Sequence, residues 1–380
     1  MRRMIVAACL AWTACLHAQD LSGPLAKIKA VGKEGAGNAE AAVAWKAIVA
    51  EGPKSIPVCL AALDDASPAA ANWIRSAIET VAEKELAAGR KLDASMLEGF
   101  VKETKHAGPA RRLAYEYLTR IDPATPKRLL PTMLDDPGAE LRRDAVGVLL
   151  EEADKHFKAK EKDSALKTYR KALVHARERD QVQLIADRLE KLGEKIDLTK
   201  HFGFITRWAW VGPFDNRKGV GFKTAYPPEK SQDLKNTYTG KEDAKVQWKE
   251  TETAKAMGIV DLNDLVGKLK GAVAYAYAAV ESPVEKQVEV RCGSNNAVRI
   301  WLNGKEIYFR EEYHHGMQMD QHVSSGTLKA GRNEILIKVC QNEQTEDWAQ
   351  LWSFQVRITD HLGGAVPVTV VTERLPAAKQ

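Results

Sequence analysis

Residues 311–322, which read EEYHHGMQMDQH, are the stretch of this chain with the most side chains able to do chemistry. They include three histidines, two methionines, one aspartate and two glutamates. Imidazole suits zinc or copper, so His315, Asp320 and His322 would form a metal site if the segment folded back on itself. However, adjacent histidines on an extended chain point to opposite sides, and the fixed short ligand spacing of strong metal sites is absent. We therefore predict a polar loop at the rim of a β-domain, without metal or cofactor, and retain the metal site as the alternative.

The sequence lacks the common catalytic patterns. It contains no G-x-S-x-G elbow, no H-E-x-x-H pair, no P-loop and no C-x-x-C-H haem attachment site. Gly35-Ala36-Gly37 matches the first two glycines of a dinucleotide-binding loop, but the third glycine of that loop is missing. We therefore predict a protein that is not an enzyme. Because a fold does not exclude grafted chemistry, an accessory or cryptic glycan-processing enzyme remains an alternative.

A β-hairpin is predicted around Asn303-Gly304 in the run VRIWLNGKEIYF, because both turn residues tolerate positive φ. One face of this hairpin should be apolar and buried. The residue pairs expected across it are Leu302 with Lys305, Ile300 with Ile307, and Val298 with Phe309. The other face would then carry Trp301 and Tyr308 as diagonal neighbours looking outward.

This outward face is the predicted ligand-binding surface. Carbohydrate recognition needs flat apolar planes beside amide and guanidinium partners. The predicted ligand-binding residues are Arg299, Trp301, Tyr308 and Arg310 on the hairpin, with Asn295, Asn296, Tyr313 and Trp348 in nearby loops. The alternative is that the same aromatic face packs against the helical half of the chain.

Alternating apolar residues predict further short strands after Phe202. These runs cover residues 273–280, 286–292, 326–339 and 352–358. The residues expected to face inward are Ile335, Ile337 and Val339 in one run, and Trp352, Phe354, Val356 and Ile358 in another. Cys292 and Cys340 lie in such runs and would either pair or remain small buried hydrophobic residues. Many short strands separated by turns predict an antiparallel sandwich or barrel.

An ordered series of segments in this half resembles a known module. The series reads WAWVGPFDN, TAYPPE, YTGKEDAKVQW, GIVDLNDL, AYAYAAVESP, VEVRCGSNNAVRIWLNGKEIYF and LKAGRNEILIKV. It resembles a jelly-roll module of large exported bacterial proteins that is related to galactose-binding-like and glycosidase accessory domains, over residues 202–362. The resemblance implies a β-sandwich jelly roll and no particular activity. Many such modules carry two aspartates where this chain has Asn295-Asn296, so a calcium or charged-ligand contact is not expected there.

The first half is predicted to be a helical stack over residues 20–152. Leu63-Asp64-Asp65 recurs as Leu134-Asp135-Asp136, and each triplet precedes a turn and a second amphipathic segment. This self-similarity has a solenoid period, with Asp or Ser expected to cap the second helix. The residues resemble HEAT-type helical repeats from about residue 40 to 152.

Residues 153–198 are predicted to form a tetratricopeptide-like helical hairpin, with a plain hairpin as the alternative. Small and aromatic residues recur there with the spacing of two touching helices. They are Ala153, Phe157, Ala165, Tyr169 and Ala172.

The N-terminus predicts export. A basic start, an apolar run of twelve residues and a small residue at Ala18 indicate a signal peptide over residues 1–19. Lipid attachment at Cys15 is the alternative. No later stretch is apolar enough to cross a membrane, and a net charge of +5 does not indicate a nucleic-acid binder.

Together these features predict an α+β multidomain chain, with an α-solenoid followed by an antiparallel jelly roll and a tail over residues 363–380. The predicted function is an exported, non-enzymatic scaffold in the periplasm or outside the cell. Its helical repeats would bind a protein partner, and its jelly roll would bind a ligand such as a polysaccharide. A protein-only scaffold without sugar binding is the alternative.

Overall fold

The computed structural model describes residues 20–372, so the predicted signal peptide and Cys15 lie outside the described residues. The chain divides into two compact units, Met1–Glu152 and Ala153–Gln380, called here the helical unit and the sheet unit. The first half of the described chain is helical and the second half carries antiparallel strands, which confirms the predicted α+β arrangement. No helix in the described part of the chain is both long and apolar enough to span a membrane.

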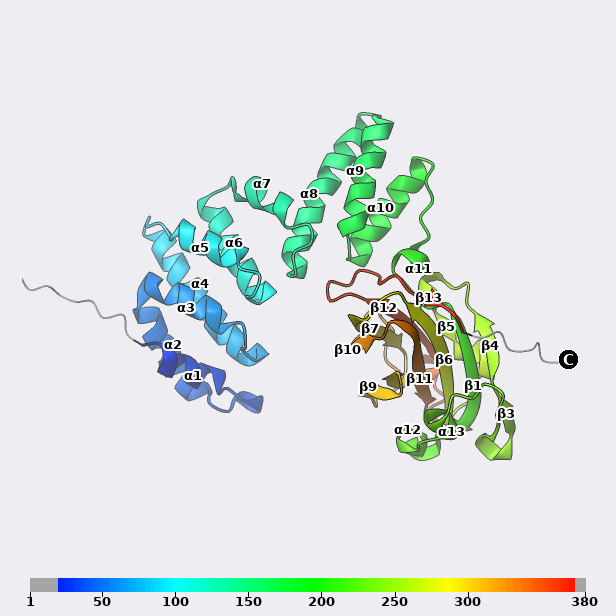
Figure 1. Ribbon diagram of the computed structural model, residues 1–380. Coiled ribbons are helices and arrows are strands. Elements are labelled where there is room, and N and C mark those ends of the chain that lie inside the picture. The colour runs from blue at the N-terminus through cyan, green and yellow to red at the C-terminus, as the bar shows by residue number, and fades with distance from the viewer. Residues whose placement is uncertain (1–19, 373–380) are drawn as a thin grey trace, which may run out of the picture. The chain divides into compact units, whose positions relative to one another are not determined.

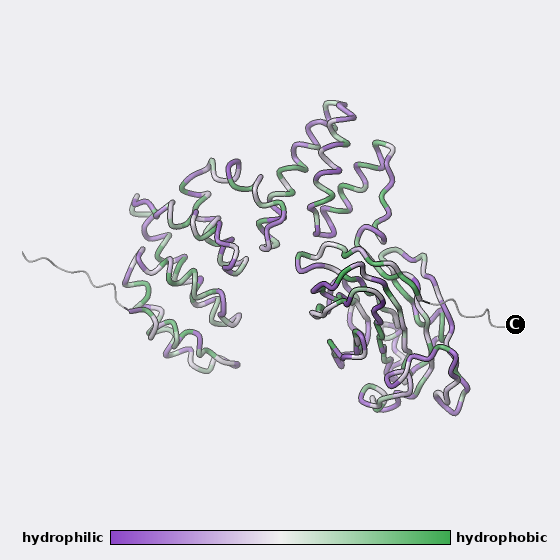
Figure 2. The backbone as a smooth tube through the Cα atoms, viewed as in Figure 1, coloured by the Kyte–Doolittle hydropathy of each residue, from purple (hydrophilic) through white to green (hydrophobic). Residues whose placement is uncertain are grey.

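The helical unit is built from successive short helices that lie side by side (Figure 1). They are α1 (Ser22–Lys29), α2 (Asn38–Ala50), α3 (Ser55–Ala62), α4 (Pro68–Ala87), α5 (Ala94–Lys102), α6 (Gly108–Ile121), α7 (Thr125–Leu129) and α8 (Ala139–Lys158). Apolar residues recur along each helix (Figure 2). In α4 the buried stripe includes Ile74, Ala77, Ile78 and Val81, which have helical spacing and join one core.

The aspartates of the repeated triplets connect helix pairs rather than capping the next helix. Ser67 caps α4 by accepting a hydrogen bond from the backbone nitrogen of Ala70 at 3.3 Å, as expected for this residue type. Asp64 instead accepts hydrogen bonds from the backbone nitrogen of Ala107 at 2.8 Å and contacts Nδ1 of His106 at 2.7 Å. It therefore ties the end of α3 to the turn before α6.

The sheet unit begins with more helices. They are α9 (Lys162–His175), α10 (Arg179–Lys191) and α11 (Leu198–His201). Ala165, Tyr169 and Ala172 of α9 are fully buried, and the ring of Phe157 meets that of Tyr169 edge-on with centroids 6.4 Å apart. The small residues of α9 are therefore buried.

Antiparallel strands make up the rest of the sheet unit. They are β1 (Arg207–Asp215), β2 (Thr237–Thr239), β3 (Lys245–Gln247), β4 (Lys249–Glu252), β5 (Val260–Asp261), β6 (Ala272–Ser282), β7 (Lys286–Ser294), β8 (Ala297–Leu302), β9 (Lys305–Arg310), β10 (His322–Leu328), β11 (Gly331–Gln341), β12 (Ser353–Thr359) and β13 (Thr369–Val370). The larger sheet has the order β4-β1-β6-β11-β8-β9 with β13 also on β6, the smaller has the order β10-β7-β12-β5, and β2 pairs with β3. Short helices α12 (Val220–Lys223), α13 (Pro227–Lys230) and α14 (Leu262–Val266) lie between strands.

The two sheets share one core. All seven residues predicted to face inward from β11 and from the run ending in β12 lie in it. Cys292 also belongs to this core, whereas Cys340 lies in a second cluster on the opposite face of the larger sheet. Both thiols are free and buried, so the two cysteines do not pair.

The predicted hairpin is present, but the register predicted for it beyond the turn is wrong. Asn303 and Gly304 have φ of 53° and 79°, and Leu302 pairs with Lys305 as expected. A β-bulge follows, after which Ile300 pairs with Tyr308 instead of Ile307. One extra residue in β9 reverses the direction of every side chain after it.

Candidate functional site

The predicted aromatic platform on the hairpin does not assemble. Because of the bulge, Trp301 packs with the cluster on the outer face of the larger sheet, whereas Tyr308 packs toward the core between the sheets. The hydroxyl of Tyr308 lies 2.9 Å from Nδ1 of His322. The two aromatic rings therefore lie on opposite sides of the sheet and cannot stack on one ligand.

The arginines of the predicted platform are occupied by local partners. Arg299 donates from Nε to Glu306 at 2.8 Å and from Nη1 to the carbonyl oxygen of Phe222 at 3.1 Å. Arg310 pairs with Glu312 at 2.7 Å. The Arg299 side chain is largely covered, at 22% exposed, whereas that of Arg310 is 57% exposed and keeps surface open to solvent.

The outer face of the larger sheet is covered by the segment between β1 and β4. Phe222, Tyr238 and Trp248 of this segment pack there with Tyr275 and Tyr277 of β6. The segment is also anchored by charge, because the fully buried Lys338 donates to Glu229 at 2.8 Å and to the carbonyl oxygen of Thr224 at 2.8 Å. The sheet unit itself therefore supplies the cover over this face.

Asn295 and Asn296 lie at the loop end of the sheets, where they hold other loops in place. Asn296 accepts a hydrogen bond from the backbone nitrogen of His314 at 3.1 Å and donates one to the carbonyl oxygen of Leu351 at 2.7 Å. Asn295 donates to the carbonyl oxygen of His315 at 3.4 Å. Since both asparagines are buried and their amides bond to the protein, they position the loops and have little capacity left for a ligand.

The loops held by these asparagines bring Tyr313, His314 and Trp348 together. The rings of His314 and Trp348 are nearly perpendicular, with centroids 5.6 Å apart, and Tyr313 lies 6.3 Å from His314. Trp348 is 61% exposed, so its indole plane is available to solvent. Asn216 at the end of β1 donates to the hydroxyl of Tyr313 at 3.2 Å and fixes that ring.

Two carboxylates complete this group, which we call the rim cluster: Glu311, Tyr313, His314, Glu343 and Trp348. Glu343 accepts a hydrogen bond from the backbone nitrogen of Lys218 at 2.8 Å. Burial, aided by the negative charges of Glu311 and Glu343, raises the pKa of Tyr313 to about 12. The tyrosine is therefore a neutral hydrogen-bonding group at physiological pH.

Sequence reasoning found only part of the rim cluster. Tyr313 and Trp348 are among the predicted ligand-binding residues, and each ring lies near that of His314. Glu311 and His314 belong to the chemically rich stretch but were not chosen. Glu343 carries no sequence signal, since its place beside Tyr313 depends on two loops that are distant in the chain.

Two of the three alternative metal ligands lie close together, but the third does not join them. The rings of His315 and His322 have centroids 6.1 Å apart. Asp320 is bonded instead to Nε of Arg357 at 2.7 Å and to Nη1 of Arg291 at 2.7 Å. Burial opposes ionisation of Asp320, but these two arginines outweigh it and hold its pKa below the usual value.

The protonation of His315 also speaks against metal binding. Gln321 accepts from the backbone nitrogen of Ser294 and donates to the carbonyl oxygen of Gly316, so its amide nitrogen must donate to Nδ1 of His315. A neutral His315 then carries its proton on Nε2, the atom that a metal would need. Across residues 20–372, no three or more His, Cys, Asp and Glu side chains are grouped to hold a metal.

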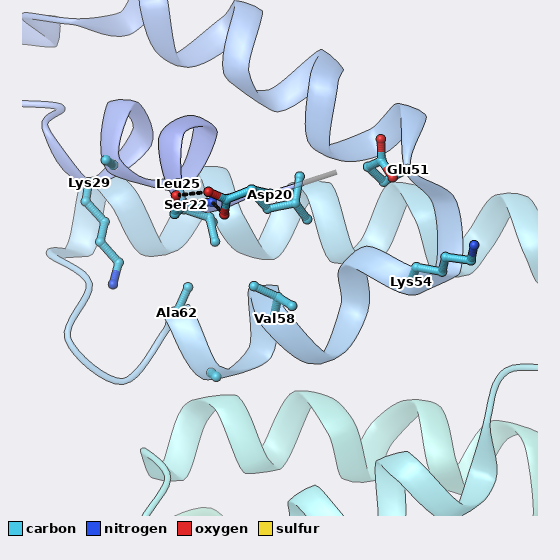
Figure 3. Close-up of a pocket in the computed structure, with 11 residues that line it drawn as sticks. Asp20, Ser22, Leu25, Lys29, Glu51, Lys54, Val58 and Ala62 are labelled. Carbon is cyan, nitrogen blue, oxygen red and sulfur yellow. Dashed lines mark hydrogen bonds between the residues drawn. The ribbon is translucent and has the colours of Figure 1, made fainter. Parts of the chain in front are cut away.

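The helical unit contains a pocket of about 650 Å³ between α1 and α3 (Figure 3). Its walls are largely apolar, with charged residues at the edge. The lining includes Leu21, Leu25, Val58, Ala61 and Ala62, with Asp20, Lys29, Glu51 and Lys54. Such a lining fits an apolar side chain better than it fits a reacting group.

No family model matches the chain, and no curated protein matches it. Solved structures that resemble part of it include a β-glucosidase from Kluyveromyces marxianus, at 11% identity and a TM-score of 0.26, over 46% of this chain and 21% of that one. The same enzyme in complex with glucose gives a TM-score of 0.27. An α-xylosidase of family GH31 from Xanthomonas citri gives 11% identity and a TM-score of 0.20, over 40% of this chain and 16% of that one. The chain thus spans about a fifth or less of the length of these proteins.

These comparisons correct the predicted function. The solved proteins named above are glycosidases, so the comparisons do not support the prediction of a non-enzymatic scaffold at the cell envelope. At TM-scores this low, neither the fold nor the activity of those enzymes passes to this chain.

Proposed function

We propose that the sheet unit recognises carbohydrate at the rim cluster, as part of a glycan-processing system. The observation that carries this proposal is the exposed indole of Trp348, held edge-on against His314. An indole plane packs well on the apolar face of a sugar ring. Glu311 and Glu343 can accept hydrogen bonds from the sugar hydroxyls at its edge.

His314 adds a further polar atom. Its Nε2 lies in hydrogen-bond contact with Oδ1 of Asn342, so the neutral ring donates there and keeps Nδ1 as an acceptor. That Nδ1 is buried and has no partner. A hydroxyl or a water molecule next to it would satisfy this acceptor, as buried polar groups require.

We propose that the two sheets are a jelly roll of the galactose-binding-like kind, and that the helical unit is a HEAT-like solenoid with a tetratricopeptide-like hairpin after it. The pocket between α1 and α3 supports a protein partner for the helical unit, because its walls are apolar and its rim is charged. Export through residues 1–19 remains a prediction.

Binding of soluble polysaccharides to wild-type protein and to Trp348→Ala tests the proposal. We expect the substitution to weaken binding about tenfold or more, because aromatic residues at the centre of a contact contribute most of its affinity. Phe309→Ala is the matched control, since Phe309 is 63% exposed and lies outside the rim cluster. A reducing-sugar assay on the same glycans measures whether binding is accompanied by hydrolysis. Failure of the wild type to bind any glycan, or equal loss in both variants, contradicts the proposal.

A further inference from the structure

A second polar pocket lies in the sheet unit, away from the rim cluster. It has a volume of about 220 Å³ and lies between the C-terminal end of α9 and the turn that follows β12. Its lining residues are Val174, Ala176, Arg177, His201, Phe202, Asp360, Gly363, Gly364 and Ala365. Pockets for drug-sized ligands usually exceed about 300 Å³, so this one fits a single small ring or a short chain.

Arg177 is held at the wall of this pocket with part of its guanidinium unused. Its Nη1 donates to the carbonyl oxygens of Val174 at 2.7 Å and Ala176 at 3.0 Å, which fixes the position of the group. Its Nε is buried and has no hydrogen-bond partner. A buried N–H of a charged group without an acceptor is costly, so an acceptor in the pocket would stabilise it.

Asp360 offers an acceptor on the other side of the pocket. Its Oδ1 accepts hydrogen bonds from the backbone nitrogens of Leu362 and Gly364, each at 2.9 Å, and these bonds fix the turn. They leave Oδ2 uncommitted. Oδ2 is therefore free to accept a hydrogen bond from a ligand in the pocket.

Gly364 separates the guanidinium from the carboxylate. A Cβ added to Gly364 would lie 3.0 Å from Nε of Arg177 and 3.0 Å from Oδ2 of Asp360. The two charged groups thus face the same small space, yet no ion pair joins these two described residues. They are poised to bond to one group placed between them.

His201 adds a neutral ring to the same pocket. Burial lowers the pKa of His201, and the positive charges of Arg177 and Arg357 lower it further. Near pH 7 the neutral imidazole offers one donor and one acceptor.

The charges around the pocket select against ionic ligands. An anion would meet the carboxylate of Asp360, and a cation would meet the guanidinium of Arg177. A hydroxyl can accept a hydrogen bond from Nε of Arg177 and donate one to Oδ2 of Asp360 at the same time. We propose that this pocket binds a neutral polyol, one sugar ring or a short chain of hydroxyls, independently of the rim cluster.

Titration calorimetry of the full chain with glycerol, glucose, galactose and mannose tests this proposal, with glucuronate and glucosamine as charged counterparts. We expect saturable binding of at least one neutral compound and weaker binding of its charged counterparts. Gly364→Ala should weaken this binding about tenfold or more, because the new methyl group fills the space between the two charged groups. Gly364 does not need a left-handed backbone, and Gly99→Ala, where a Cβ would meet nothing within 4 Å, is the matched control.

Asp360→Asn is the more specific variant. It keeps an Oδ1 acceptor for the turn but replaces the free oxygen with a donor and removes the negative charge. We expect it to lose about tenfold in affinity for the neutral polyol and to gain affinity for glucuronate. In a Trp348→Ala background, which removes the contribution of the rim cluster, saturable binding of the neutral polyol should persist, and Gly364→Ala should weaken it there as it does in the wild type. No saturable binding by the wild type, or unchanged binding by Gly364→Ala, would overturn the proposal, whether or not the rim cluster binds glycans.

Discussion

His322 is a buried histidine whose pKa is lowered by its surroundings. Burial, aided by the charges of His315 and Arg310 and opposed by Glu312, lowers its pKa to about 4. Tyr308 contacts Nδ1 of the ring at 2.9 Å. The folded protein therefore keeps His322 neutral under conditions in which an unfolded histidine takes up a proton.

This shift predicts a loss of stability on acidification. Between pH 6.5 and about 4, the unfolded chain binds a proton at His322 that the folded chain does not, so the free energy of unfolding falls as the pH falls. A shift of this size corresponds to at most about 3 kcal/mol. Urea unfolding at pH 7.5 and pH 5 should show a smaller difference for His322→Gln than for the wild type. His361→Gln, at an exposed position, is the control and should keep the wild-type difference.

The direction of a side chain on a strand was easier to predict than its burial. Ser353, Gln355 and Arg357 alternate with the inward residues of β12, so the alternation places them on the outward face. They do face away from the shared core, yet all three are buried, and Arg357 is 1% exposed because Asp320 and nearby loops cover it. Alternation in a sequence reports the face of a strand, but it does not report a loop that folds over that face.

At the scale of elements, neighbouring helices of the helical unit are joined by a buried ion pair. Arg111 of α6 donates two hydrogen bonds to Asp136, each at 2.7 Å, and a third to the carbonyl oxygen of Val101 at 2.8 Å. Asp136 also accepts from the backbone nitrogen of Gly138 at 2.8 Å. The pair connects α5, α6 and the turn before α8, and its side chains are 1% and 5% exposed.

Removing one partner of this pair should be strongly destabilising. Asp136→Ala would leave the Arg111 charge buried without compensation, so we expect a cost of about 3–5 kcal/mol in the free energy of unfolding. Glu83→Ala is the comparison, since Glu83 pairs with Arg120 at the surface, where both side chains are about half exposed. That change should cost about 1 kcal/mol or less. Similar unfolding midpoints in urea for the two variants would show that the buried pair contributes little.

The existence of most elements in the sheet unit could be predicted from the sequence. Alternating runs located β6, β7, β11 and β12, and Asn303-Gly304 located the turn between β8 and β9. The bulge in β9 could not be predicted, because Ile307 differs in no way from an ordinary strand residue. The rim cluster was only half predicted for a related reason, since the approach of two loops depends on tertiary packing and not on local pattern.

At the scale of the whole molecule, the chain divides at residues 152 and 153 into two compact units. Helix α8 runs through this position, with Leu141 and Ala145 in the core of the helical unit. Further along the same helix, Asp154 accepts a hydrogen bond from Nε of Arg188 in α10 at 3.1 Å. Each unit nevertheless has its own buried cluster of apolar residues, which is the usual condition for independent folding.

Scanning calorimetry should therefore resolve two unfolding transitions. We expect Asp136→Ala to lower the temperature of one transition, because that residue belongs to the helical unit. Arg357→Met should lower the other, because it breaks the bonds to Asp320 in the sheet unit. If both variants move one common transition, the units are not thermodynamically separate. A protein partner bound by the full chain is expected to remain bound by residues 20–152 alone.

The single-residue insertion in β9 has a consequence for how such hairpins diverge. Successive side chains along a strand point to opposite faces. One residue gained or lost therefore reverses which of the following side chains point to the core and which to solvent. Here that exchange turns Tyr308 inward and leaves Phe309 facing the solvent. A lineage could therefore create or erase an aromatic display on this hairpin by changing its length alone, with no change in the kinds of amino acid it contains.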